Sequence, residues 1–151
     1  MIRRARADEA AALTGIAHSA KRHWGYPEAW IEAWREDLTV TAEYVRDQIV
    51  FAEVQTDAAL GFYALEPNGR TAELAHLWVE PEHLGKNIGS RLFEHALEQA
   101  HAAGILELLI DSDPYAAGFY ERMGAIQVGS VDAPMDGVER TRPQYQISFA
   151  S

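Results

Sequence analysis

The sequence has no cysteine, no long apolar run and no internal repeat. Without cysteine there can be no disulfide bond, no thiolate nucleophile and no cysteine-ligated zinc. A membrane-spanning helix needs about 18 or more consecutive apolar residues, and the sequence has no such run. The opening segment MIRRARADEAAAL also lacks the apolar core of a secretory signal. We therefore expect a cytoplasmic protein with no membrane partner.

Basic residues are scarce in the second part of the chain. The net charge is −10; residues 1–46 carry seven basic and seven acidic side chains, whereas residues 47–151 carry six and sixteen. Nonspecific nucleic-acid binding depends on Lys and Arg contacts to phosphates, so we expect no nucleic-acid partner. The acidic field favours small cationic partners by long-range attraction, although an acidic surface also serves solubility alone.

Length and patterning indicate one mixed α/β domain over residues 1–151. The chain is long enough to bury a core, and its 48% hydrophobic and 24% charged residues are ordinary for a globular protein. Periodicity and turn residues predict the order β-α-α-β-β-β-α-β-α-β-β.

The expected helices have recognisable ends. Asp8 is the expected N-cap of the first helix, and the second covers residues 26–38. The third runs from about Asn87 to Ala103, and the fourth ends at Gly124. After a short first strand, the expected strands are 48–57, 58–67, 71–81, 105–111, 125–131 and 145–150. The near-continuous apolar run 105–111 is expected to be buried on both faces.

The stretch VEPEHLGKNIGSRLFEHA joins a predicted strand to a predicted helix. Backbone N–H groups at a helix N-terminus favour an anion, and Gly85 and Gly89 allow a phosphate to approach the backbone closely. Lys86 and Arg91 add positive charge in the acidic part of the chain. The layout matches neither a Walker A loop nor a Rossmann fingerprint. Taken alone, the stretch predicts either a phosphate cradle or an ordinary strand–turn–helix connection.

Residues 71–125 resemble the core of the GNAT superfamily of acetyl-CoA-dependent N-acetyltransferases. The residues Val79-Glu80-Pro81, followed by Leu84 to Gly89, fit the family frame of a strand, a proline and Q/R-x-x-G-x-G/A. Asp113 to Ala125 fits the second family element, N-x-x-A-x-x-F/L-Y-x-x-x-G-A/F. The resemblance implies a GNAT-like fold around a splayed mixed sheet. It also implies direct transfer of the acetyl group of acetyl-CoA to a primary amine. The histidines show no i, i+4 pair and no H-E-x-x-H pattern, so we expect no metal.

Three positions depart from the family pattern. Leu84 replaces a polar residue, Asn87 replaces a glycine, and Asp113 replaces an asparagine. Asparagine tolerates positive φ, so the turn can survive. As a helix N-cap, the Asn87 side chain would instead occupy an amide that a phosphate uses. We expect weaker or slightly altered pyrophosphate binding, not its loss.

The resemblance also implies roles for individual residues. Tyr120 is the candidate general acid that protonates the leaving thiolate. Phe119 beside it is a candidate cofactor contact, with helix packing as the alternative. The candidate cofactor-binding residues are Leu77, Trp78, Val79, Leu84, Gly85, Lys86, Asn87, Ile88, Gly89, Ser90, Asp113, Ala116 and Phe119.

The candidate general base is Glu73, which shares a strand face with Ala75, Leu77 and Val79. In histone-type members of the family a glutamate at this offset serves as the base. The alternative for Glu73 is a solvated carboxylate at a strand end. His76, on the opposite face, is the second candidate, and an ordered water is the third.

The acceptor side is marked by aromatic residues. Trp24 and Tyr26, in a predicted loop, are the candidate acceptor-binding residues, and an aromatic wall suits a cationic amine. Trp30 and Trp34 fit core packing better.

Two other functions stay open, acetylation of a protein lysine or N-terminus and binding of acyl-CoA by a degenerate sensor. Domains of this family often pair, so a homodimer is among the expected assemblies.

Overall fold

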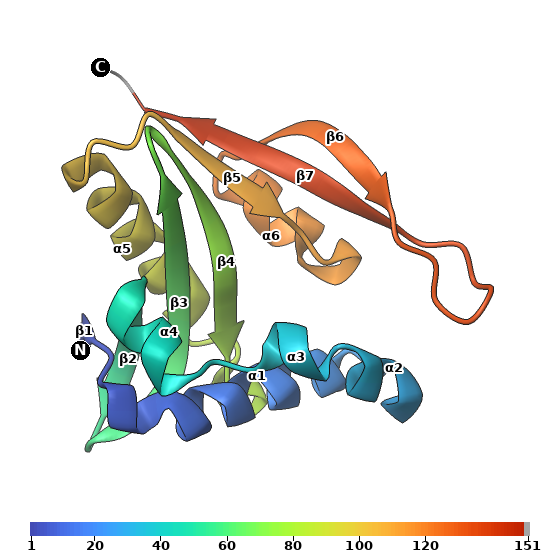
Figure 1. The fold of residues 1–151 in the computed structure, drawn as a ribbon, viewed down its shortest axis with the longest axis horizontal. Coiled ribbons are helices and arrows are strands. Elements are labelled where there is room, and N and C mark those ends of the chain that lie inside the picture. Colours follow the sequence, from blue (N-terminus) through green and yellow to red (C-terminus); the bar gives the residue numbers. More distant parts are fainter. Residues whose placement is uncertain (150–151) are drawn as a thin grey trace. The chain divides into compact units, whose positions relative to one another are not determined.

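The computed structural model describes residues 1–149 and confirms the mixed α/β class (Figure 1). Seven strands follow the order β1-β2-β3-β4-β5-β7-β6. The elements are β1 (Ile2–Arg4), α1 (Ala10–His23), α2 (Glu28–Ala33), α3 (Arg35–Leu38), α4 (Ala42–Asp47), β2 (Ile49–Gln55), β3 (Ala58–Asn68), β4 (Thr71–Val79), α5 (Ile88–Ala102), β5 (Glu107–Asp111), α6 (Ala117–Arg122), β6 (Ile126–Asp132) and β7 (Thr141–Ser148).

The chain divides into two compact units. The first contains residues 1–65 and 76–96, and the second contains residues 66–75 and those from 97 onward. The expectation of one domain over 1–151 stays a prediction. Positions 150 and 151 lie outside the described residues. Position 150 is also the last residue of the strand expected at 145–150.

The N-terminal helices differ in detail from the predicted ones. Asp8 is not an N-cap, because a 3₁₀ turn (Ala7–Glu9) precedes α1 and Glu9 Oε1 accepts from the Arg6 backbone N–H at 2.7 Å. The single helix expected over 26–38 is divided into α2 and α3 at Trp34. The short helix α4 was not predicted; Thr41 caps it by accepting from the Tyr44 N–H at 3.0 Å.

In the first unit, the two faces of β2 and β3 pack against different helices. Side chains of one face, including Val50, Ala52, Phe62 and Ala64, form a core with Leu13, Ile16 and Ala17 of α1 and Val45 of α4. Tyr63 points to the other face, where its hydroxyl lies 2.7 Å from His95 Nδ1 on α5 and its ring stacks on Phe51. This division follows from the alternation of side chains along a strand.

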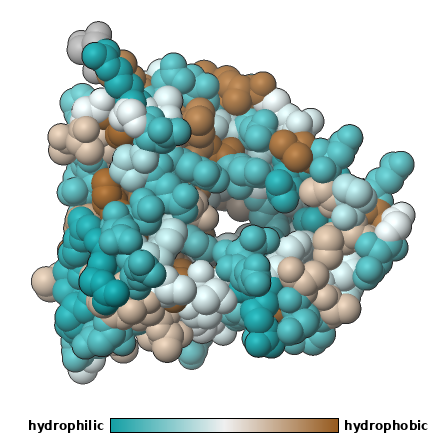
Figure 2. Space-filling view, in the orientation of Figure 1, coloured by the Kyte–Doolittle hydropathy of each residue, from teal (hydrophilic) through white to brown (hydrophobic). Residues whose placement is uncertain are grey.

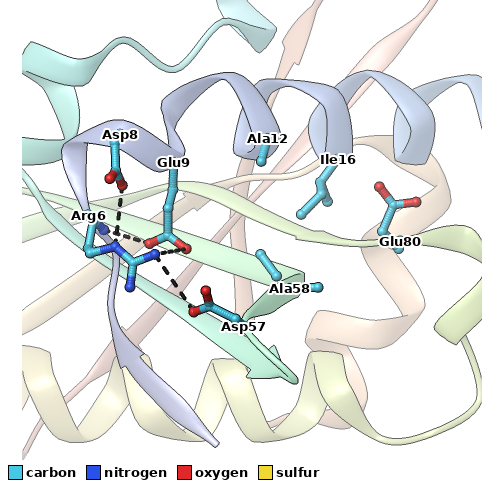
Figure 3. A pocket seen from close by; sticks show the side chains of 9 residues that line it. Arg6, Asp8, Glu9, Ala12, Ile16, Asp57, Ala58 and Glu80 are labelled. Carbon is cyan, nitrogen blue, oxygen red and sulfur yellow. Dashed lines mark hydrogen bonds and ion pairs between the residues drawn. The ribbon is translucent and has the colours of Figure 1, made fainter.

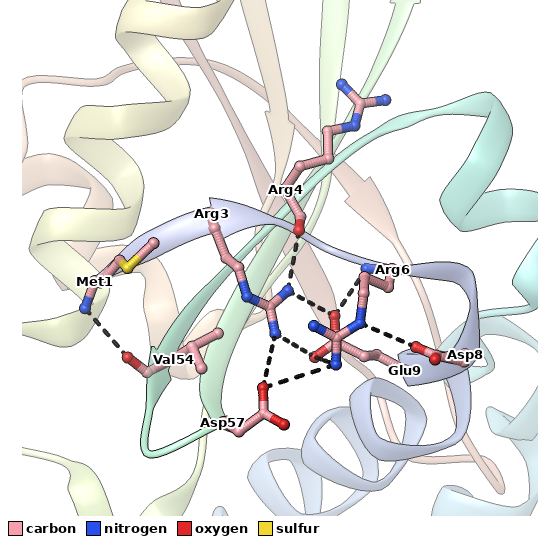
Figure 4. A network of polar contacts seen from close by, with 8 residues as sticks. All are labelled: Met1, Arg3, Arg4, Arg6, Asp8, Glu9, Val54 and Asp57. Carbon is pink, nitrogen blue, oxygen red and sulfur yellow. Dashed lines mark hydrogen bonds and ion pairs between the residues drawn. The ribbon is translucent and has the colours of Figure 1, made fainter.

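An ionic network joins β1 to the start of α1 (Figure 4). Arg3 donates to both carboxylate oxygens of Glu9 at 2.8 and 2.9 Å, and Arg6 lies within ion-pair distance of Glu9 and Asp57. The hydrogen bond from Arg3 is the main reason that the pKa of Glu9 is lowered to about 2. Glu9 therefore stays ionised although it is buried.

In the second unit, β5 is covered less than expected. Leu108 and Ile110 are buried, but Leu109 is 38% exposed, so the prediction of burial on both faces is wrong. The exposed face also carries Glu107 and Asp111, and this period-two pattern of charges indicates a strand with one solvated face. β5 pairs antiparallel with β7, and β7 pairs antiparallel with β6.

The helix α6 ends as predicted. Gly124 has φ +96°, its N–H donates to the Glu121 carbonyl at 3.1 Å, and the Ala125 N–H donates to the Tyr120 carbonyl at 3.0 Å. These two bonds form a Schellman motif, which needs a residue that tolerates positive φ.

The molecular face drawn in Figure 2 is mostly hydrophilic, with scattered apolar patches. Among the helices formed by residues 1–149, none combines the length and apolar character required to cross a membrane.

Candidate functional site

The predicted phosphate turn forms between β4 and α5, in the first unit. After Val79, a 3₁₀ turn (Pro81–His83) leads to four exposed residues, 84–87, and α5 begins at Ile88. Gly85 has φ +83° and Asn87 has φ +62°. Asn87 therefore adopts the backbone conformation for which the family uses glycine. The turn leaves backbone N–H groups at the start of α5, a position suited to an anion.

Arg91 holds this turn in place. Its Nη1 donates to the Lys86 carbonyl at 3.0 Å, and its Nε donates to Glu53 Oε1 at 2.9 Å. Glu53 on β2 is buried and also accepts from the Met1 amino group at 2.7 Å. Burial alone would raise the pKa of Glu53, but these hydrogen bonds lower it overall. Glu53 was not among the predicted site residues, although one carboxylate within the apolar strand IVFAEVQ is a signal of an internal ion pair.

Gly61 on β3 allows β3 to approach the end of β4 closely. A Cβ atom at Gly61 would lie 2.8 Å from the Trp78 carbonyl oxygen and 3.1 Å from Leu92 Cδ1 of α5. Nearby, the Glu80 N–H donates to the Leu60 carbonyl at 2.8 Å. The strand end Leu77-Trp78-Val79 and the turn after it therefore depend on a glycine at position 61.

His76 is held in an aromatic environment. It is 8% exposed, the Trp78 indole N–H donates to its Nδ1 at 3.0 Å, and the rings of Tyr44 and Phe62 lie 5.8 and 5.7 Å away. A general base must accept a proton on a ring nitrogen, and Nδ1 already accepts this hydrogen bond. The geometry favours a structural role for His76.

Glu73 lies in the second unit, where β4 and β5 separate. The parallel register pairs Thr71 with Glu107, Ala72 with Leu108 and Glu73 with Leu109, and extends no further among residues 1–149. Glu73 is an exposed residue of β4; partial desolvation of its carboxylate and the charges of Glu66 and Asp111 raise its pKa above the usual value. A carboxylate with a raised pKa is a better proton acceptor near neutral pH.

Tyr120 lies on α6 in the same unit and is 7% exposed. Its ring contacts Phe119 and Tyr145, with centroids 5.3 and 6.2 Å away. Burial, followed by the charge of Asp113, raises its pKa well above the usual value of a phenol. Tyr120 therefore carries its proton throughout the neutral range, and its raised pKa makes it a weaker acid than an ordinary phenol.

Asp113 has a definite structural role. Its Oδ1 accepts from the Tyr115 N–H at 2.9 Å and caps the 3₁₀ turn Pro114–Ala116 that leads into α6. Aspartate and asparagine are equally good caps, so the departure from the family's asparagine preserves this turn. Ala116 and Phe119 lie half-buried on the same segment.

The candidate acceptor residues of the first unit gather around a lysine. The Trp24 and Trp78 ring centroids are 6.0 Å apart, and Tyr26 meets Trp34 edge-on at 5.0 Å. The ammonium of Lys21 on α1 lies over the rings of Trp24, Tyr26, Trp34 and Trp78. Trp34 packs partly on the core as predicted, but it also belongs to this group. Lys21 was not among the predicted site residues, although its i, i+3 spacing to Trp24 is a signal that the two lie on one side of the end of α1.

A separate hollow of about 460 Å³ lies beside α1 and the β2–β3 turn (Figure 3). Its walls include Arg6, Asp8, Glu9 and Asp57, which pair with one another, and it contains none of the predicted site residues. No cluster of three metal-ligating side chains is found within residues 1–149.

Comparison with known proteins identifies relatives. Residues 13–125 match the Acetyltransferase (GNAT) family. The "IAA acetyltransferase" of Azospirillum brasilense is 32% identical over 72 residues, which are 46% of this chain and 47% of that protein. The chain thus spans about half the length of this curated relative.

Two solved structures share the fold. The GCN5-related N-acetyltransferase from Rhodopseudomonas palustris has a TM-score of 0.81 at 21% identity, over 99% of this chain and 95% of that one. The PaiA N-acetyltransferase from Thermoplasma acidophilum, in complex with coenzyme A, has a TM-score of 0.76 at 22% identity, over 99% and 98%.

Proposed function

The chain belongs to the Acetyltransferase (GNAT) family, and from this premise we propose that it transfers the acetyl group of acetyl-CoA to a primary amine of a small cationic acceptor. The observation that carries the proposal is the turn before α5, where residues 84–87 are exposed and Gly85 and Asn87 have positive φ. Such a turn suits the pyrophosphate of a CoA molecule. The related PaiA structure contains coenzyme A, which supports the same ligand here.

The proposed cofactor seat has two parts. Residues Leu84 to Ser90 bind the pyrophosphate through backbone N–H groups, with Arg91 holding the turn. The segment Leu77 to Val79 supplies main-chain contacts to the acetyl group and pantetheine arm. The cofactor would pair with this strand end in the way that an additional β-strand does. The family resemblance separately implies cofactor contacts for Asp113, Ala116 and Phe119. Leu84, 51% exposed, offers an apolar contact where the family has a polar residue.

Replacing Asn87 by glycine tests the turn. Because Asn87 has φ +62°, glycine relieves backbone strain there, and we expect Asn87→Gly to preserve or tighten CoA binding in calorimetric titrations. Asn87→Val, with a β-branched residue at positive φ, should weaken binding. A sharp loss of affinity in Asn87→Gly would contradict the proposed role of the turn.

The proposed chemistry divides the proton transfers between two side chains. Bound acetyl-CoA supplies an activated thioester carbonyl. Glu73, or an ordered water, removes a proton from the acceptor amine as the new C–N bond forms. Tyr120 donates its phenolic proton to the sulfur as the C–S bond breaks. His76 ranks behind Glu73 because its Nδ1 accepts from Trp78.

The proposed role of Glu73 as the base predicts a specific pH dependence of kcat/KM. A base works only when deprotonated, so kcat/KM should fall as pH drops through its pKa, and the raised pKa of Glu73 moves this acid limb above the usual value for glutamate. Glu73→Gln should lower kcat/KM by about 10²–10⁴-fold and remove the limb. Glu66→Gln removes one charge that raises the Glu73 pKa, so it should move the limb to lower pH. An unaltered pH–rate profile in Glu73→Gln would place the base elsewhere.

Thiol release from acetyl-CoA across a panel of amines tests the function itself. Amine-dependent release supports the proposal, and release only with peptides or proteins indicates the protein acetylase. CoA binding without turnover on any amine indicates the sensor.

A homodimer is part of the proposal; exposed Ile126 and Val128 on β6, the terminal strand of the sheet, would support it.

A further inference from the structure

The ammonium of Lys21 is enclosed by four aromatic rings, which we call the Lys21 cage. It lies 4.4 Å from the Trp34 centroid, 5.2 Å from that of Tyr26, 5.8 Å from that of Trp24 and 5.9 Å from that of Trp78. Lys21 is in the last turn of α1, Trp24 and Tyr26 follow α1, Trp34 lies between α2 and α3, and Trp78 is on β4. Residues from four places in the first unit therefore converge on one cation.

This arrangement has the chemistry of a cation-binding site. A cation within about 6 Å of an aromatic ring centroid is attracted to the ring face, and several rings together form the cages that bind quaternary ammonium groups. Lys21 and the four ring residues are all half-buried, so the site is partly shielded from water while remaining partly open. A lysine ammonium is normally solvated, and its position here indicates that the rings replace part of its hydration.

We propose that the Lys21 cage is a binding site for cationic ammonium groups and that Lys21 is a tethered occupant that competes with them. The proposal deepens the proposed function, since Trp78 directly precedes Val79 at the strand end assigned to the cofactor. A free cation can enter only when Lys21 leaves, so its apparent dissociation constant equals the intrinsic constant divided by the fraction of molecules in which the cage is open. Lys21 thereby excludes weakly binding cations and admits only acceptors that offer further contacts.

The chain has only two lysines, Lys21 and Lys86, which makes displacement directly observable. In protein carrying ¹³C-lysine, ring currents should shift the Lys21 ε-CH₂ signal away from the usual position, while exposed Lys86 serves as the internal reference. Titration with tetramethylammonium, a permanent cation that cannot be acetylated, should return the Lys21 signal toward the usual position. A Lys21 signal that does not move at saturating tetramethylammonium overturns the proposal.

A pair of variants tests the competition by affinity. Lys21→Met removes the charge and keeps the chain length, so the dissociation constant for tetramethylammonium, followed by tryptophan fluorescence, should fall by about tenfold. Arg22→Met makes the same charge change on the neighbouring exposed residue, which pairs with Glu28 outside the cage, and should leave that constant unchanged.

Both experiments omit acetyl-CoA, so their failure is separate from a failure of acetyl transfer. If folded Lys21→Met binds tetramethylammonium with a dissociation constant equal to or higher than that of the unaltered protein, Lys21 only stabilises the packing of α1 against its neighbours. That result overturns the proposal. If Lys21→Met does not fold, the lysine spectra of the unaltered protein still decide.

Discussion

Tyr120→Phe is expected to lower kcat by about 10²–10⁴-fold while leaving the dissociation constant of CoA nearly unchanged. The substitution removes one hydroxyl from a side chain that is 7% exposed and keeps the ring packed against Phe119 and Tyr145. The fold is therefore retained, and the lost group is the proposed proton donor for the leaving sulfur. Steady-state kinetics with acetyl-CoA and the best amine of the panel measure the first quantity, and calorimetry measures the second.

Tyr145→Phe is the matched control, because it also deletes the hydroxyl of a buried tyrosine in the same unit. Tyr145 donates to Glu121 Oε2 at 2.6 Å, so its loss should cost about 1.5–3 kcal/mol of unfolding free energy and leave kcat within a few-fold. Equal turnover in Tyr120→Phe and the unaltered protein would remove Tyr120 from the mechanism.

The pH dependence supplies a second check on Tyr120. Its folded pKa lies above the ordinary phenol value, so the protonated, active form persists beyond pH 10. Any loss of activity between neutral pH and pH 10 must therefore come from another group. The alkaline limb of the pH–rate profile should have the same midpoint in Tyr120→Phe and in the unaltered protein.

Gly61→Ala is the second substitution with a large expected effect. The new Cβ would lie 2.8 Å from the Trp78 carbonyl oxygen and 3.3 Å from Val79 Cα, both backbone atoms that cannot rotate away. The end of β4 must shift, which should cost roughly 1–3 kcal/mol of unfolding free energy. Because the same residues lead into the turn 84–87, CoA affinity should fall as well. Chemical denaturation and calorimetry measure the two effects.

Gly15→Ala makes the same chemical change where there is room. Gly15 lies inside α1 with no heavy atom within 4 Å of the added Cβ, so alanine should raise the unfolding free energy by up to about 1 kcal/mol. CoA affinity should not change. If both variants behave alike, the close approach at Gly61 does not control β4 or the turn.

Much of the architecture could be predicted from the sequence because it depends on local signals. The turn residues before α5, the glycine after α6 and the β-rich runs of β2 and β3 around a polar turn each indicate their own conformation. The helices between β1 and β2 were predicted less well. Short helices such as α3 and α4 contain too few residues for a periodic pattern, and their ends depend on packing and on caps such as Thr41.

The parts of the candidate site that were missed depend on contacts between distant residues. Glu53 and Arg91 are 38 positions apart, and Lys21 meets Trp78 only because α1 and the end of β4, from His76 onward, belong to one unit. One-dimensional patterning contains little information on such pairs. The close approach at Gly61 differs from these contacts, because a glycine within an apolar strand is by itself a sequence signal of close backbone approach.

A structure of the protein with bound CoA tests the central claim most directly. The pyrophosphate should lie against the backbone N–H groups of residues 84–90 at the start of α5, with the pantetheine arm running along Leu77 to Val79. CoA bound at any other place, with residues 84–90 making no contact to phosphate, would contradict the proposed function of this turn.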